Sequence, residues 1–256
     1  PSRSAANDSC ESFFAMTKLS VIIPVYNEEK ILVNNITKLY KKMLLLKRGF
    51  EICIVDDGST DNTGKIGKAL SKKPKIRYIN FRNGPSRREN LALAFRNSKK
   101  DIIMFIDADL STNLFYLGQI LGKIDEGYDI SIGSRYMGIK AKRKFGRRVI
   151  SIIYNCFLRL YFQSKIRDHQ CGFKAFGRKL LFKLLDEMGY DKSLHRGWFW
   201  DAELLIRAQH NSYKIAEIPV VWKSSARSTF KLGIELKMLK SIYGLKSKLR
   251  RNNYRS

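Results

Sequence analysis

The chain has 256 residues, with 49 Lys and Arg against 23 Asp and Glu, and therefore a formal net charge of +26. Its hydrophobic content of 44% excludes a disordered basic tail, and its length suits a single domain with a sizeable core. The charge is uneven, because residues 1–135 carry 22 basic and 15 acidic residues while residues 136–256 carry 27 and 8. This asymmetry predicts an anionic partner for the second half: a nucleic acid, a phosphate ligand or a membrane surface.

The sequence has no apolar run long enough to predict a membrane-spanning helix. Residues 1–15 lack the pattern of a secretory signal, and we interpret them as an added leader or a disordered extension. The four cysteines form no CxxC pair, which favours a reducing, cytoplasmic setting. Cys53 lies in an apolar run and is expected in the core.

Short apolar runs alternate with amphipathic segments along the first half of the chain. We expect strands at 19–25, 50–55, 76–80, 101–106 and 128–132, and helices at 28–46, 63–70 and 86–98. Strands that alternate with helices predict βαβ units and a mostly parallel sheet. The strands are apolar throughout rather than alternating, as expected when both faces of the sheet are covered. The predicted fold class is therefore a single α/β domain.

Three polar turns follow predicted strands: Pro24–Glu28, Asp56–Asp61 and Asp107–Asp109. Each is also compatible with ordinary helix capping. Because ligands of open α/β sheets bind at the carboxyl ends of the strands, three such turns at one edge favour a ligand site. Asp57 is suited to accept the imide N–H of uracil or guanine, and Tyr26 to pack on that ring.

Of the three turns, Asp107-Ala108-Asp109 gives the most specific indication of a chemical function. Two carboxylates one residue apart, directly after an apolar strand, can reach one hard cation. Mg²⁺ or Mn²⁺ takes one or two protein carboxylates together with water and substrate phosphate oxygens. Such a metal neutralises a diphosphate leaving group. The turn therefore predicts a metal and nucleotide site.

The motif order PVYNE, VDDGSTD, RNGPSRREN, DADLS and GSRY resembles the inverting glycosyltransferases of family 2, over residues 19 to about 231. The resemblance implies the A-type glycosyltransferase fold, with a mostly parallel central sheet flanked by helices and a Rossmann-like nucleotide-binding half. It also implies metal ligands at Asp107 and Asp109, the latter catalytic. The nucleotide-binding positions that it implies are Pro24, Tyr26, Glu28, Val55, Asp57, Asp107 and Lys231.

The second half is similar to the polyprenyl-phosphate hexosyltransferase branch, the dolichyl-phosphate mannose synthases and glucosyltransferases. Arg147, Ser151 and Asn155 recur at helical spacing. In this branch the residues matching Arg135, Arg147 and Ser151 bind the acceptor phosphate, a chemistry that guanidinium groups suit. The alternative for Arg147 is a solvated basic face, since six of the nine residues from Lys140 to Arg148 are basic.

Two later segments, DHQCGFK from Asp168 and RGWFWDAELL from Arg196, resemble the glucosyltransferases more than the mannose synthases. This favours UDP-glucose over GDP-mannose as the donor. Asp201 stands where many family members have a catalytic base, although it is also compatible with capping a helix over 201–210. A phosphate acceptor needs little deprotonation, so we expect Asp201 to orient substrate. His169 is the only neutral-pH proton shuttle of its segment, but a loop histidine without a role is favoured.

The sequence departs from the family at three places. Ser111 stands where mannose synthases often carry Gln, which leaves the third metal contact open. The Gly-Gly stretch expected after GSRY is shortened to 137–140. Near the C-terminus Lys231 matches a diphosphate-binding position, whereas the spacing of Arg227 is off by two.

Two basic amphipathic stretches, 142–162 and 231–251, are expected either to lie in a membrane interface or to pack on the core with one face in water. The apolar residues of the first are Val149, Ile150, Ile152, Ile153, Phe157 and Leu160, and those of the second are Leu232, Leu236, Leu239, Ile242, Tyr243 and Leu249. Anionic lipid attracts such basic segments. We therefore expect peripheral binding to an anionic membrane.

Together these patterns predict an enzyme that transfers a hexose from a nucleotide sugar to a polyprenyl (dolichyl-type) phosphate, with Mg²⁺ or Mn²⁺ as cofactor and Asp201, Arg135 and Asp109 as catalytic residues. We expect a catalytic domain over 16–230, a basic helix and tail over 231–256, and a location on the cytoplasmic face of a membrane, with a possible membrane-anchoring subunit. One alternative is a soluble or glycan hydroxyl acceptor, for which Asp201 must act as a base. A nucleic-acid-binding module is disfavoured because the acidic turns would repel a phosphate backbone.

Overall fold

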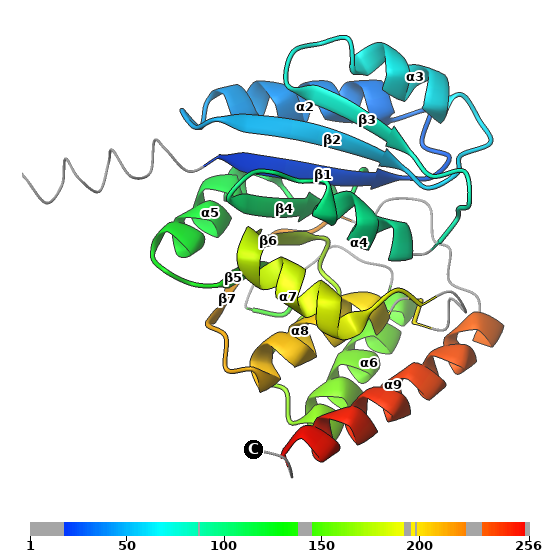
Figure 1. The fold of residues 1–256 in the computed structure, drawn as a ribbon, viewed down its shortest axis with the longest axis vertical. Coiled ribbons are helices and arrows are strands. Elements are labelled where there is room, and N and C mark those ends of the chain that lie inside the picture. The colour runs from blue at the N-terminus through cyan, green and yellow to red at the C-terminus, as the bar shows by residue number, and fades with distance from the viewer. Residues whose placement is uncertain are drawn as a thin grey trace, which may run out of the picture.

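The computed structural model describes residues 18–86, 88–137, 145–191, 196–197, 199–223 and 232–253, with only the backbone of 145–148, 232–237 and 252–253. These residues form one seven-stranded sheet in the order β3-β2-β1-β4-β6-β5-β7 (Figure 1). Its strands are β1 (Leu19–Val25), β2 (Phe50–Asp56), β3 (Ile76–Asn80), β4 (Ile102–Ile106), β5 (Ile130–Ser134), β6 (Phe173–Gly177) and β7 (Ile215–Pro219). Strand β6 is antiparallel to both of its neighbours, and the other pairs are parallel. The predicted mostly parallel sheet is confirmed.

Helices cover both faces of this sheet, and α6, α8 and α9 form a further cluster at one side of it. They are α2 (Leu32–Leu44), α3 (Thr63–Leu70), α4 (Glu89–Arg96), η1 (Leu114–Tyr116), α5 (Leu117–Asp125), α6 (Phe145–Phe162), α7 (Arg178–Met188), α8 (Phe199–His210) and α9 (Leu232–Asn253). Within the described part of the chain, no helix is both long and apolar enough to cross a membrane.

The predicted helix over 28–46 begins four residues late, at Leu32. The Glu28 amide donates to Thr63 Oγ1 in the neighbouring turn, at 2.8 Å, and Asn27 has a left-handed φ of 55°. These tertiary contacts hold the first residues in a turn and delay the helix. The strand predicted at 128–132 lies at 130–134, because Gly127, with φ of 89°, closes the preceding helix.

The sheet is buried on both faces, which explains its continuously apolar strands. In β1, Leu19, Val21 and Ile23 pack under α2 and α5, whereas Ile22 packs under α4 and α7 on the other face. Cys53 is buried in the core, as predicted.

Helices α6, α8 and α9 share a third, smaller core (Figure 1). Leu158 and Phe162 from α6 meet Phe199 from α8 and Ile242 from α9. Lys246 of α9 also donates to the carbonyl oxygen of Tyr161, at 2.6 Å. The basic segment at the end of the chain therefore packs on the sheet domain through α8.

Candidate active site

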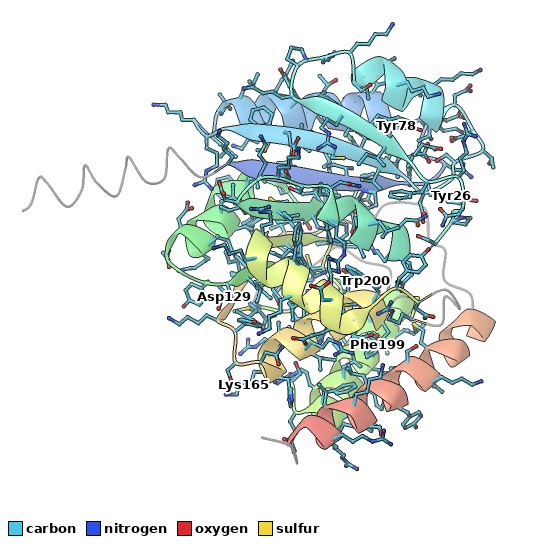
Figure 2. All side chains as sticks on the ribbon, viewed as in Figure 1. Tyr26, Tyr78, Asp129, Lys165, Phe199 and Trp200 are labelled. Atoms are coloured by element: carbon cyan, nitrogen blue, oxygen red, sulfur yellow. The ribbon has the colours of Figure 1, made fainter. Side chains whose placement is uncertain are left out.

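The three polar turns do lie at one edge of the sheet, because β2, β1 and β4 are adjacent and parallel. The first two turns interlock. Asn27 Oδ1 accepts from the Thr60 amide at 2.8 Å, and the Asn27 amide donates to Ser59 Oγ at 2.9 Å. Figure 2 shows Tyr26 at this end of the sheet and Asp129 at the opposite end.

Asp57 is held by the loop that precedes α4. Its carboxylate accepts from the Ser86 amide at 2.8 Å and from Asn90 Nδ2 at 2.7 Å. A Cβ at Gly84 would lie 1.9 Å from the Asp57 carbonyl oxygen, so only glycine permits this approach. The Asp57 carboxylate is therefore held in a fixed position by neighbouring parts of the chain.

The other predicted nucleotide positions differ in accessibility. The Tyr26 side chain is 41% exposed and available for stacking, and Pro24 and Glu28 are half-buried. Val55 pairs with Pro24 in the sheet register, but its side chain is packed in the core beneath the turn. Lys231 lies outside the described residues.

Asp107 and Asp109 form the turn after β4. The Asp107 amide donates to the Gly172 carbonyl oxygen at 3.0 Å, and a Cβ at Gly172 would lie 1.8 Å from Asp107 Oδ2. The Asp107 carboxylate therefore packs against the backbone of Gly172, at a position where no other residue would leave room for it. The chain turns at Ala108 and Asp109, and Leu110, directly after the second acid, has a left-handed φ of 48°.

The donor set of this turn fits a divalent cation. The Asp107 side chain is 38% exposed, and Asp109 is half-buried, so both carboxylates can be reached from the sheet edge. Ser111 donates to Asp109 through its amide, at 2.9 Å, and through its hydroxyl, at 2.5 Å. Ser111 thus orients the Asp109 carboxylate, and two carboxylates plus water and phosphate would make a site suited to Mg²⁺ or Mn²⁺. The described residues contain no cluster of three His, Cys, Asp or Glu that would hold a metal by themselves.

An ion network not predicted from the sequence lies behind this turn. Asp201, buried in the first turn of α8, accepts from Lys174 Nζ at 2.9 Å and pairs with Arg88 Nε at 3.2 Å. Arg88 also reaches Asp107 Oδ1, at 3.3 Å, from the start of α4. Lys174 donates in addition to the Cys171 carbonyl oxygen at 2.6 Å.

This network controls the protonation of its acids. Burial by itself would raise the pKa of Asp201, but Lys174 and Arg88 outweigh that effect and hold it below the usual range. The pKa of Asp107 is raised, by removal from water and by its acidic neighbours Asp109 and Asp201, while Arg88 opposes the shift. Asp201 is therefore a paired carboxylate within α8, which begins at Phe199, and it does not cap the helix predicted at 201–210.

A signal for Lys174 was present in the sequence. It is the only charged residue of the apolar strand β6, and a buried lysine requires a carboxylate partner. Arg88 had no comparable signal among the many surface arginines. Its position depends on the left-handed turn at φ 90° that precedes α4.

Arg135 directly follows β5 and forms a bidentate pair with Asp168. Its Nε and Nη2 each donate to an Asp168 oxygen at 2.6 Å, and its amide donates to Asp168 at 2.9 Å. Burial would raise the pKa of Asp168, but Arg135 dominates and lowers it. On α6, Ser151 Oγ lies 2.6 Å from the hydroxyl of Tyr136. Tyr136 thus links the predicted acceptor residue Ser151 to the segment that carries Arg135, whereas the Arg147 side chain lies outside the described residues.

His169 is a buried structural residue rather than the role-free loop histidine expected. Its Nδ1 lies 3.0 Å from Asn155 Oδ1, and its Nε2 lies 2.9 Å from Ser164 Oγ. Asn155 donates through its amide nitrogen to the Ser151 carbonyl oxygen, so its Oδ1 faces the ring and requires a proton on Nδ1. Burial lowers the pKa of His169 to about 4, which excludes a proton shuttle near neutral pH.

Residues 20–185 match the model of glycosyl transferase family 2, over more than half of the chain. The chain belongs to glycosyl transferase family 2. This confirms the resemblance predicted from the motifs, and the A-type fold of the family agrees with the observed sheet. Glucosyl-3-phosphoglycerate synthase of Mycobacterium tuberculosis, in complex with Mn²⁺ and UDP-glucose, has a similar fold, with a TM-score of 0.66, 18% identity and coverage of 94% of this chain and 83% of that one.

Curated relatives of this family 2 protein point to the predicted branch. Glycosyltransferase AglD of Haloferax volcanii is 35% identical over 82% of this chain, which spans 34% of that protein. Dolichyl-phosphate beta-glucosyltransferase ALG5A of Trichomonas vaginalis is 31% identical over 88% of this chain and 71% of its own length. The Dictyostelium discoideum dolichyl-phosphate beta-glucosyltransferase is 30% identical over 80% of this chain and 66% of its own length. The chain thus spans about a third of AglD and about two thirds of the dolichyl-phosphate enzymes.

We predict that His169 makes the stability of the family 2 domain sensitive to mild acid. Below its ordinary pKa of about 6.5, the unfolded chain takes up a proton that the folded protein refuses until about pH 4. Stability is therefore lost as the pH falls through this window, by about 2 kcal/mol between pH 7 and pH 5. Urea unfolding of His169→Gln should show a correspondingly shallower pH dependence. His210→Gln, which changes a half-buried histidine on α8, is the control, and equal slopes for wild type and His169→Gln would contradict the prediction.

Proposed function

We propose that this protein is a metal-dependent inverting transferase that moves glucose from UDP-glucose to a polyprenyl (dolichyl-type) phosphate at a membrane surface. The observation that carries the proposal is the placement of Asp107 and Asp109 at the same sheet edge as Asp57, with buried Lys174 and Arg88 paired to Asp201 behind it. The dolichyl-phosphate beta-glucosyltransferases among the relatives support both the sugar and the acceptor class.

The donor occupies the edge formed by β2, β1 and β4. Tyr26 offers an exposed ring to the base, and the pre-positioned Asp57 carboxylate keeps acceptor capacity for an imide N–H. The half-buried Pro24 and Glu28 lie in the same turn as Tyr26, and Val55 supports this turn from the core. Mg²⁺ or Mn²⁺, held by Asp107 and Asp109, would stabilise the departing diphosphate.

The acceptor phosphate lies on the side of β5 and α6. Asp168 engages Nε and Nη2 of Arg135, and we assign the remaining Nη1 to a phosphate oxygen. Ser151, held by Tyr136, supplies a hydroxyl. We assign the second guanidinium to Arg147, as the resemblance to this branch implies. In-line placement of two charged reactants in a fixed site would supply most of the rate.

Asp201 orients this site and does not act as a base. Both of its oxygens are engaged by cations, and its lowered pKa makes it a weak proton acceptor. This disfavours a neutral hydroxyl acceptor, which must lose its proton. A phosphate oxyanion imposes no such demand.

Substitution of Asp201 distinguishes a residue that orients the site from a residue that acts as a general base. We expect Asp201→Asn to lower turnover on polyprenyl phosphate by about tenfold, through loosened Arg88 and Lys174, and not by the 10²- to 10⁴-fold typical of a lost general base. The shape of the pH–rate profile should be unchanged. Asp186→Asn, which alters an exposed pair with Arg96, is the control and should match the wild type. Undiminished turnover of Asp201→Asn under saturating substrates would contradict the role of Asp201 in orienting the site.

A panel of nucleotide sugars tests the proposed reaction as a whole. With polyprenyl phosphate and Mn²⁺ or Mg²⁺, we expect transfer from UDP-glucose in preference to GDP-mannose, and loss of transfer on chelation. Thin-layer separation of labelled lipid product measures it. Transfer to a free hydroxyl acceptor, with none to any lipid phosphate, would overturn the acceptor assignment.

Helix α6 carries an apolar face that is not part of the core. All six of its predicted apolar residues are exposed, with Leu160 at 82% and Ile153 at 63%. Stacking of Phe157 on Tyr161, and of Tyr161 edge-on against Tyr243, continues this surface onto α9. On α9 itself, Leu239 is exposed but Ile242 is buried, so one face of that helix packs in the core and another contributes to the surface.

We propose that this α6–α9 surface contacts an anionic membrane on its cytoplasmic face. Aromatic and aliphatic groups suit the acyl boundary, and basic groups attract lipid phosphate. A shallow cavity of about 250 Å³ beside Tyr243 is lined by Tyr161, Tyr243, Lys246, Ser247, Arg250 and Arg251. Its three cations suit a phospholipid headgroup.

Vesicle sedimentation tests this surface. We expect salt-sensitive binding to vesicles with anionic lipid, and at least about a tenfold loss on Leu160→Glu, because an exposed leucine can then no longer enter the apolar layer. Leu45→Glu, on a leucine that is 73% exposed beyond α2, is the matched control and should bind as the wild type. Lipid-independent behaviour of the wild type would contradict membrane contact.

A further inference from the structure

Arg88 has a left-handed backbone conformation, which is unusual for a residue with a long side chain that forms buried ion pairs. It precedes α4 with φ 90° and ψ −17°, a conformation that favours glycine. A long side chain at such a position costs free energy that the rest of the structure must offset, and strain of this kind gathers at functional sites. The next residue, Glu89, is buried and clamped by Arg196 through two contacts of 2.8 and 2.7 Å. The turn is therefore rigidly placed.

The guanidinium of Arg88 lies between two acids with different roles. It is 3.2 Å from Asp201 Oδ2 and 3.3 Å from Asp107 Oδ1, and it stacks 4.5 Å from the centre of the Phe105 ring. Charge-assisted contacts in proteins are usually nearer 2.7–2.9 Å, the distance at which Lys174 holds Asp201. Arg88 is thus loosely bound to Asp107, whose carboxylate is also the most accessible of the network.

Because Asp107 is a proposed metal ligand, Arg88 and a divalent cation claim the same carboxylate. Two cations that share one acid repel each other, so a neighbouring guanidinium lowers the affinity for a metal arriving alone. A diphosphate reverses that balance, since its added negative charge gives the guanidinium a new partner. Phosphate oxygens suit the planar fork of arginine.

We propose that Arg88 is a positioning residue that couples metal binding to donor binding: it neutralises Asp107 in the donor-free enzyme and moves its contact to the donor diphosphate when metal and nucleotide bind together. This inference rests on the proposed metal site at Asp107 and Asp109. The coupling would keep the enzyme from holding a metal unproductively without its nucleotide. Asp201 would retain Lys174 throughout, so the acid is never left unpaired.

The test measures binding rather than turnover. Mn²⁺ affinity is determined by electron paramagnetic resonance of the free ion, with and without UDP, for wild type, Arg88→Gly and Arg88→Gln. Arg88→Gly suits the left-handed backbone and preserves the fold, and Arg88→Gln retains side-chain bulk. We expect both variants to bind Mn²⁺ alone about fivefold tighter or more, and UDP in the presence of Mn²⁺ correspondingly weaker. A purely structural role would weaken both affinities together.

Two further variants make the outcomes distinguishable. Arg96→Gln removes the same charge from the same helix, at an exposed pair with Asp186, and should leave both affinities unchanged. Asp107→Asn should abolish Mn²⁺ binding, and retained binding would overturn the metal site and the coupling with it. If Asp107→Asn loses Mn²⁺ while Arg88→Gly binds Mn²⁺ no more tightly than the wild type, the metal site stands and the role of Arg88 is overturned. Unchanged UDP binding in Arg88→Gly would likewise overturn the coupling.

Discussion

The chain of ion pairs from Lys174 through Asp201 and Arg88 to Asp107 is the constraint around which the site is built. It joins the end of β4 and the start of α4, in the first half of the chain, to β6 and α8 in the second half. A buried charge without a partner is strongly destabilising, so each of these elements must be in place for the others to be tolerated. The same requirement sets the chemistry, because a carboxylate held by two cations stays ionised and makes a poor base.

A second buried network supports the first. Arg196 forks onto Glu89, next to Arg88, and lies 3.7 Å from Glu203, which Arg207 holds on α8. Bidentate arginine pairs fix orientation as well as distance. The start of α4 is thereby attached to α8, and the strained turn at Arg88 is held in place by a second set of buried ion pairs.

The distribution of charge now has a structural basis. The less basic first half supplies the acidic turns at the carboxyl ends of β1, β2 and β4. The strongly basic second half supplies Arg135, Lys174 and α9, together with the exposed apolar face of α6. Arg135 and Lys174 are paired with Asp168 and Asp201, so most of their charge is compensated within the protein. The surface excess on α9 is what a membrane or another anionic partner would meet.

The sequence alone predicted strands β1 to β5, helices α2 to α4 and the three-turn edge, because apolar period and turn chemistry are local properties. It also determined the family, through motifs that stand in order along the chain. It did not predict strands β6 and β7 or helices α5 and α7. Only the tertiary structure decided which charged side chains meet: the order of β4, β6 and β5 placed Lys174 beside Asp201, and the turn before α4 placed Arg88 between two acids. It likewise decided that His169 is buried and that the apolar residues of α6 are exposed. Such pairings depend on long-range packing, which no local pattern encodes, since many arginines and lysines look alike until burial selects among them.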